Sequence, residues 1–292
     1  MTSTRSAHWL IIGPPLGFLL VFFLIPFLFT FKISLAESLI AIPPYSALIS
    51  QDAAHHWVIN ANLASYRYLF SDPVYAVSYL YSLKTALSCT LGCLLLGYPA
   101  AYAMARAPKP LQPILVLIIM LPFWTSFLLR VYALEDLIRD TGLLNLLLLK
   151  VGLIHSPLHL LRTPTGVFIG IMYSYLPFMV LPLYATLEKL DGSLLEAAAD
   201  LGAKPWQVFR DVTLPLSVPG IFAGSLLVFI PAIGEYVIPD LMGGPSTPMI
   251  GKVLWTEFFE NHNWPVASAV AVCLMTVVLI PLLLKKLWSL RA

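Results

Sequence analysis

Long apolar runs separated by short polar segments make up most of the chain. A membrane-spanning helix needs about 20 mostly apolar residues, and six runs reach that length. The first run is longer than the roughly 7–15 apolar residues of a secretory signal segment, so we interpret it as a retained anchor. The pattern therefore predicts an all-α membrane protein with six spans at residues 9–31, 77–104, 111–134, 165–187, 216–238 and 265–288.

Basic residues indicate the orientation of these spans, because cytoplasmic loops carry an excess of Lys and Arg. Nine basic residues fall in segments 1–8, 105–110, 188–215 and 285–292, whereas the other three loops, together twice as long, hold six. Both chain ends are therefore expected in the cytoplasm. The predicted organisation is a cytoplasmic N-terminus (1–8), a six-span domain (9–288) with a cytoplasmic loop (188–215), and a cytoplasmic tail (289–292).

Composition agrees with a membrane location and excludes several functions. The chain is 59% hydrophobic and 11% charged, which leaves too little polar surface for a soluble domain. A net charge of +2 without a basic cluster argues against nucleic-acid binding. Gly251 and Lys252 superficially resemble a phosphate-binding loop, but Ser246 and Val253 replace residues that such a loop requires. We expect no catalytic residues, no metal site and no cofactor in this chain.

The most informative polar segment is the predicted cytoplasmic loop. Its order is Glu196-Ala197-Ala198, Gly202 after three residues, Val212 after nine more, and then Leu214-Pro215. Ser193 and Glu196 form a capping-box pattern, which predicts a helix that begins at about Leu194. Gly202 can adopt the left-handed conformation that ends a helix, and Pro205 suits the first turn of another. We predict two short helices, the second at residues 205–212.

This order and spacing resemble the cytoplasmic loop of membrane subunits of binding-protein-dependent ABC importers. The resemblance implies that the loop docks an ATPase dimer, which binds the ATP and Mg²⁺ that this chain lacks. An amphipathic helix resting on lipid headgroups is the alternative interpretation of the segment. The residues expected to dock the ATPase are Glu196, Ala197, Ala198, Gly202, Trp206, Phe209 and Arg210.

Further segments, at residues 121–133, 175–184, 229–245, 250–259 and 263–271, look like permeases of polyamine (spermidine/putrescine) importers. The resemblance covers most of the chain from about Tyr66. It implies the type I ABC importer permease fold in a bacterial inner membrane. It also implies a second related permease and a periplasmic polyamine-binding protein as partners. The alternatives are an ABC permease for sulfate, molybdate or iron, and a secondary transporter or channel that works alone.

Glu235 is the main candidate for contact with the cargo, because a carboxylate within a span is costly and normally faces a cavity, a partner or a substrate. An acidic group beside aromatic rings suits an ammonium cargo. A structural ion pair of Glu235 with Arg130, with Lys84 or with a residue of a partner chain is an equally good interpretation, although Arg130 and Lys84 lie near span ends and can extend to the interface. The other candidate pathway residues are Tyr236, Asp240, Trp124, Tyr173 and Tyr175, for which packing or interfacial roles are the alternative.

Overall fold

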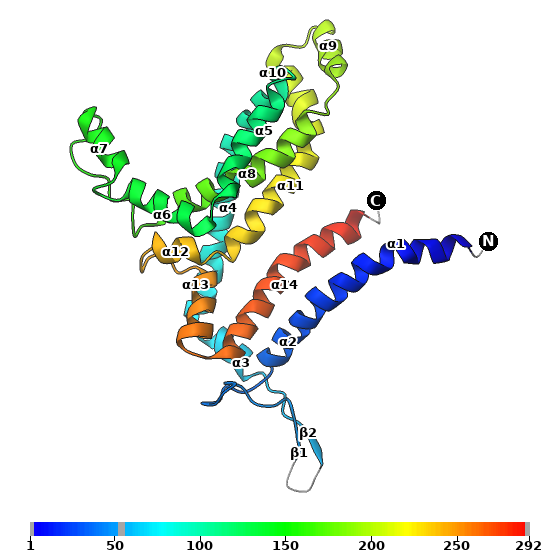
Figure 1. Ribbon diagram of the computed structural model, residues 1–292, viewed down its shortest axis with the longest axis vertical. Coiled ribbons are helices and arrows are strands. Elements are labelled where there is room, and N and C mark those ends of the chain that lie inside the picture. Colours follow the sequence, from blue (N-terminus) through cyan, green and yellow to red (C-terminus); the bar gives the residue numbers. More distant parts are fainter. Residues whose placement is uncertain (1–2, 52–55, 290–292) are drawn as a thin grey trace. The chain divides into compact units, whose positions relative to one another are not determined.

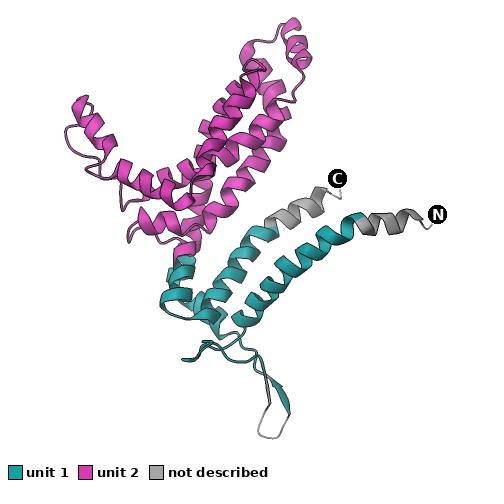
Figure 2. Cartoon of the chain, in the orientation of Figure 1, with its two compact units in different colours: residues 1–77, 253–292 teal, residues 78–252 magenta. Residues whose placement is uncertain are grey.

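Helices form nearly all of the ordered structure in a computed structural model that describes residues 3–51 and 56–289 (Figure 1). Contacts divide the chain into two compact units (Figure 2). The first unit contains residues 1–77 and 253–292, and the second contains residues 78–252. All residues proposed above for docking or for the pathway belong to the second unit.

The first unit begins with one continuous apolar helix formed by α1, η1 and α2. Ile11, Phe18 and Phe29 on this helix are mostly exposed, which suits contact with lipid. Helix α14 packs against α2 and α3, and the two strands pair antiparallel. The elements of this unit are α1 (Ser3–Leu19), η1 (Leu20–Leu24), α2 (Ile25–Ser34), β1 (Ile49–Gln51), β2 (Trp57–Ile59), α3 (Ala64–Ser71), η4 (Thr256–Glu260) and α14 (Trp264–Ser289).

The second unit is built on the long helices α4, α8 and α11, and shorter helices connect them. Helices α4 and α13 each begin in one unit and end in the other. The elements are α4 (Pro73–Arg106), α5 (Gln112–Met120), η2 (Leu121–Trp124), α6 (Phe127–Ile138), α7 (Leu143–Lys150), α8 (Pro164–Leu187), α9 (Gly192–Asp200), α10 (Pro205–Val208), η3 (Phe209–Thr213), α11 (Leu214–Ile233), α12 (Val237–Leu241) and α13 (Ile250–Trp255).

Helices α8 and α11 pack extensively against each other. Gly220 and Gly224 lie four residues apart on α11 and therefore face the same side. A Cβ atom at Gly224 would lie 3.0 Å from the Met179 carbonyl oxygen, and one at Gly220 would lie 3.0 Å from the Pro182 carbonyl oxygen. Small residues at this spacing let membrane helices approach closely, since packing rather than the hydrophobic effect holds such helices together.

Helical segments occupy all six ranges predicted as spans, but the third is not straight. Four helices in the described part are long and apolar enough to cross a membrane, and the pair Gln112–Trp124 and Phe127–Lys150, bent by 93°, is a fifth candidate. The apolar stretch Trp264–Ile280 of α14 is shorter. The span predicted at 111–134 is therefore bent rather than one continuous helix. Pro122 cannot donate a backbone hydrogen bond, and the helix tightens into the 3₁₀ turn η2 before it breaks.

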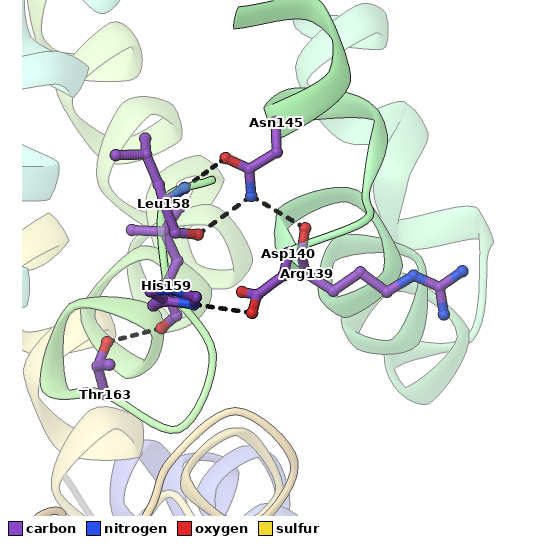
Figure 3. A network of polar contacts seen from close by, with 7 residues as sticks. Arg139, Asp140, Asn145, Leu158, His159 and Thr163 are labelled. Carbon is purple, nitrogen blue, oxygen red and sulfur yellow. Dashed lines mark hydrogen bonds and ion pairs between the residues drawn. The ribbon is translucent and has the colours of Figure 1, made fainter. Parts of the chain in front are cut away.

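A polar network holds together the loop that contains α7, as Figure 3 shows. The buried Asn145 side chain donates to the carbonyl oxygens of Arg139 and Leu158, at 3.1 Å each, and accepts the Leu158 N–H at 2.7 Å. His159 Nδ1 lies 2.7 Å from Asp140 Oδ2. One fully buried amide thus satisfies three backbone groups that would otherwise be unpaired, which gives this loop a defined conformation.

Candidate functional site

The predicted cytoplasmic loop forms a helical hairpin between α8 and α11, and its first helix, α9, begins earlier than predicted. Asp191 is the N-cap: its Oδ1 accepts the N–H of Ser193 at 3.0 Å, and α9 starts at Gly192. This hydrogen bond holds the pKa of the Asp191 carboxyl below its ordinary value. The predicted capping box of Ser193 and Glu196 is therefore wrong. Asp and Ser are equally good caps, and the one two residues upstream is used.

The end of α9 follows the prediction. Gly202 has a φ of 85°, in the left-handed region. The Gly202 N–H donates to the Ala199 carbonyl and the Ala203 N–H to the Ala198 carbonyl, which together form the Schellman pattern of a helix C-terminus. The predicted sharp turn at Gly202 is thus confirmed, and it separates α9 from the next helix.

The second predicted helix does begin at Pro205, but it does not end near Val212. Helices α10, η3 and α11 form one continuous helix over Pro205–Ile233, 29 residues long. Pro215 has no N–H to donate to the carbonyl oxygen four residues earlier, that of Asp211. The helix continues through this position by way of the π-helical turn η3. At 1.5 Å per residue the continuous helix is about 44 Å long. The hairpin is therefore joined stiffly to the predicted fifth span.

The predicted docking residues divide into an exposed group and an internal group. Glu196 and Ala197 are exposed, Ala198 is half-buried, and Trp206 is 66% exposed. Phe209 instead packs edge-on against Tyr98 and Tyr102 of α4, with ring centroids 5.6 Å and 6.1 Å away, and it stacks on Trp206 at 5.4 Å.

Arg210 forms an exposed ion pair with Asp211 at 2.7 Å. Leu201 is a further exposed apolar residue of the hairpin, at 89%. The sequence analysis did not include Leu201 among the docking residues, although an apolar residue just before the turn at Gly202 was a usable signal. The surface open to a partner is therefore formed by α9, Leu201 and Trp206, whereas Phe209 attaches the second helix to α4.

A second site lies at the other end of α11. This helix ends at Ile233, within the fifth predicted span (216–238), so Glu235 lies not in a helix but in the break between α11 and α12. Its Oε2 accepts the hydroxyl of Tyr175, and its Oε1 accepts the N–H groups of Val237 at 2.9 Å and Ile238 at 3.3 Å. The side chain is 7% exposed. Glu235 thus caps the short helix α12 and joins it to α8.

Glu235 and Tyr175 line a cavity of about 480 Å³. Tyr175 is the twelfth of the 24 residues of α8, so the cavity lies about 17 Å from either end of that helix. In a membrane this position is near mid-depth, where an uncompensated charge is costly. The residues that line the cavity are Phe123, Phe127, Arg130, Ser174, Tyr175, Phe178, Pro231, Gly234, Glu235, Tyr236 and Val237.

Arg130 lines this cavity rather than extending to the interface, the other position that its place near a span end allows. Its Cζ lies 5.2 Å from the ring centroid of Phe123 and 5.8 Å from that of Phe127, both within cation–π range. Among the described residues, Arg130 forms no ion pair, and neither its Nε nor the buried Ser174 Oγ has a hydrogen-bond partner. The ion pair between Arg130 and Glu235, one of the alternative interpretations, is therefore not formed.

Three predicted pathway residues lie outside the cavity lining. Trp124 is 75% exposed at the bend before α6, and Tyr173 is partly exposed on α8. Asp240 forms an ion pair with Lys252 at 3.0 Å. Because the helix breaks after Ile233, Asp240 and Glu235 do not share a helix face. Of the predicted pathway residues, Glu235, Tyr175 and Tyr236 are brought together.

Sequence reasoning also missed Gly251, which lets α13 approach the break after α11. A Cβ atom at Gly251 would lie 2.3 Å from the Gly234 carbonyl oxygen and 2.6 Å from the Glu235 carbonyl oxygen. No larger residue fits without movement of the backbone around the carboxylate. A glycine within a helical segment can indicate a close backbone contact, and this was the available signal. The sequence analysis considered the segment only for its weak likeness to a phosphate-binding loop.

Apolar helices that enclose a charged cavity near mid-depth are typical of membrane transport proteins, and comparison with known proteins narrows this class. Residues 94–289 match the family described as "Binding-protein-dependent transport system inner membrane component". The chain is 45% identical over 213 residues to the "Spermidine/putrescine transport system permease protein PotB" of Salmonella typhimurium, which is 73% of this chain and 74% of that relative. The protein of the same description from Haemophilus influenzae is 41% identical, over 77% of this chain and 79% of that relative.

A solved bacterial ABC transporter involved in the import of the acidic polysaccharide alginate has a similar chain, with a TM-score of 0.66 at 18% identity over 99% of this chain and 98% of that one. At this identity the likeness shows the fold alone. The present chain belongs to the family of binding-protein-dependent transport system inner membrane components, and it has the type I ABC importer permease fold. It is thus a membrane permease subunit of an ABC importer.

Proposed function

We propose that this chain is one of two related permeases of an ATP-driven polyamine importer in a bacterial inner membrane. A periplasmic binding protein delivers putrescine or spermidine. A cytoplasmic ATPase dimer binds ATP and Mg²⁺ and drives the two permeases between outward-facing and inward-facing states. Both chain ends and the hairpin of residues 188–215 face the cytoplasm, and lipid surrounds the spans.

The observation that carries the choice of cargo is the 45% identity to a spermidine/putrescine permease over 73% of this chain. The chemistry of the cavity supports it. A polyamine is a chain of methylene groups with an ammonium at each end, and aromatic faces bind such a cation by cation–π contact. Phe123, Phe178 and Tyr175 form a continuous aromatic wall, with neighbouring ring centroids 5.0 Å and 6.0 Å apart. Glu235 adds a carboxylate beside this wall.

The hairpin supports the proposed source of energy. An ATPase that moves as a rigid body can shift a membrane helix only through a stiff connection. The exposed surface of α9, Leu201 and Trp206 offers apolar anchors for a groove on such a partner. The continuous helix Pro205–Ile233 then carries the displacement to the break that holds Glu235.

Transport by the complete importer tests the proposal. The complex, in proteoliposomes with its binding protein present, is supplied with labelled putrescine, spermidine, sulfate or molybdate, each with and without ATP. We expect ATP-dependent uptake of a polyamine and no uptake of either anion. ATP-dependent uptake of an anion alone would assign the permease to another solute. Polyamine uptake driven by an ion gradient without ATP would identify a secondary transporter.

The proposed orientation has a separate test. Glu196→Cys introduces an exposed thiol in α9, whereas Cys89 and Cys93 are buried. An impermeant thiol reagent should label this cysteine in inside-out vesicles and not in intact spheroplasts. Labelling in intact spheroplasts would place the hairpin outside the cell and exclude contact with a cytoplasmic ATPase.

A further inference from the structure

Arg130 and the cargo compete for the same place in the cavity, and this inference rests on the proposed function. We propose that the Arg130 guanidinium is an intramolecular substitute for the cargo's ammonium group. It occupies the aromatic part of the cavity when no cargo is bound, and an arriving alkylammonium displaces it. Arg130 would thereby set both the affinity of the cavity and the kind of cation that enters it.

The geometry around Arg130 is that of a bound cation. Its guanidinium lies over two rings, Phe123 and Phe127, at 5.2 Å and 5.8 Å from their centroids. Phe123 in turn contacts Phe178, whose ring lies beside Tyr175. The ring that binds Arg130 is therefore part of the wall that a cargo ammonium would use, so both cations cannot hold it at once.

The contacts of Arg130 are also weak enough to be exchanged. A buried guanidinium usually pairs with a carboxylate and donates several hydrogen bonds. In the described part of the chain, Arg130 has no ion pair, and its Nε is buried without a partner. The nearby carboxylate of Glu235 is already engaged by the Tyr175 hydroxyl and by two backbone N–H groups. Ring contacts are therefore the main interactions that hold the guanidinium in place.

Charge balance requires Arg130 to leave when cargo enters. The empty cavity holds one guanidinium and one carboxylate among its lining residues. A diammonium cargo would bring two more positive charges beside a single negative one, and like charges at short range in a poorly solvated site repel strongly. The repulsion is relieved only if the guanidinium moves away. The cargo must then replace the ring contacts that Arg130 gives up, which an alkylammonium can do better than a strongly hydrated inorganic cation.

The expected effect on affinity follows from this competition. The apparent Kd of a ligand rises by the reciprocal of the fraction of molecules whose site is open. Cation–π contact at a partly buried site makes molecules with the guanidinium on the rings about threefold to thirtyfold more numerous than molecules with the guanidinium displaced. Removal of the guanidinium should therefore tighten binding of a diamine by about threefold to thirtyfold.

Equilibrium binding of labelled putrescine to the complete, nucleotide-free complex in lipid nanodiscs, without the binding protein, tests the proposal. We expect Arg130→Met to lower the Kd by about threefold to thirtyfold, and Arg130→Lys to lower it less, because lysine keeps the charge but lacks the planar guanidinium. The control is Arg139→Met, which removes the same charge from an exposed residue paired with Asp136 and outside the cavity lining. It should leave the Kd unchanged.

Unchanged or weaker binding in Arg130→Met would overturn the proposal, and equal tightening in Arg139→Met would reduce it to a general electrostatic effect. If Arg130→Met fails to assemble, Arg130→Lys decides in the same assay. ATP-driven uptake by the wild-type complex separates the two ideas. Uptake of putrescine with no effect of Arg130→Met on the Kd refutes the competition alone, whereas uptake of no polyamine refutes the proposed function and this inference with it.

Discussion

Gly202 offers a direct test of the hairpin, because its substitution has one physical consequence. Its φ is 85°, and no heavy atom of residues 3–51 or 56–289 lies within 4 Å of the place where a Cβ would be. A side chain at this position therefore meets no neighbour and adds only the strain of a left-handed backbone. That strain is about 1–2 kcal/mol for an ordinary residue, smaller for Asn, and larger for a β-branched residue.

The strain translates into weaker docking. It lowers the fraction of molecules whose hairpin has the docking conformation, so the apparent Kd for the ATPase rises by at most the same factor. With about 1.4 kcal/mol for each factor of ten, this strain corresponds to a Kd increase of at most about fivefold to thirtyfold for Gly202→Ala. The increase should be larger for Gly202→Val and smaller for Gly202→Asn.

The assay is the binding of purified ATPase to permease complexes in nanodiscs, with Gly192→Ala as a matched control. Gly192 lies at the other end of α9, also has open space around it, and does not have a positive φ. Alanine there should leave the Kd at or slightly below the wild-type value, since alanine favours helix. The reasoning is refuted if Gly192→Ala is as harmful as Gly202→Ala, or if Gly202→Val binds like the wild type.

Three other substitutions test the cavity, the helix packing and the hairpin cap. Tyr175→Phe removes the hydroxyl that donates to the Glu235 carboxylate. A hydrogen bond to a charged group contributes about 1.5–3 kcal/mol, so kcat/KM for ATP-driven uptake should fall about tenfold or more. Unchanged uptake would contradict a role of this hydrogen bond in transport. Gly224→Leu places a side chain against the Met179 carbonyl oxygen. Overpacking costs about 1–3 kcal/mol, so the thermal unfolding midpoint in detergent should fall. An unchanged midpoint would refute the close contact between α8 and α11 at Gly224. The pKa of Asp191 is lowered by its cap hydrogen bond, so the cap is complete above about pH 4 and is lost as the pH falls through the lowered pKa. Hydrogen exchange of the backbone amides of α9 should accordingly be slower in the wild type than in Asp191→Ala only above that range, and a difference that persists below it would contradict the assignment.

Structural features that depend on a few neighbouring residues were predictable from the sequence. Long apolar runs predicted where the helices lie, because a run of that length has few other stable conformations. Gly202 and Pro205 predicted the turn and the start of the next helix, since each has a restricted backbone preference. The choice between Asp191 and Ser193 as N-cap was not predictable, because both are good caps and only two residues separate them.

Contacts between distant segments were not predictable. Tyr175 and Glu235 are 60 residues apart, and the hydrogen bond between them depends on the close approach of α8 and α11. Arg130 reaches the cavity because the chain bends by 93° before α6, and the apolar pattern there is the same as for a straight span. The continuity of α10 with α11 was equally hidden, because Pro215 usually marks the start of a helix and here follows a π-helical turn.

The contacts around the cavity indicate which of its sides can move. Helices α8 and α11 approach closely at Gly220 and Gly224, and Glu235, just after the end of α11, joins α8 to α12 through hydrogen bonds. This side should move as one body when the hairpin tilts, and a tilt of about 5° over a 44 Å helix displaces its far end by about 4 Å. The opposite side, η2 and α6, lines the cavity with aromatic rings and with Arg130, which has no ion pair in the part of the chain that the structure describes. Ring contacts have no fixed hydrogen-bond geometry and can slide at little cost, so we expect the cavity to change shape along η2 and α6 while the carboxylate stays with α8 and α11.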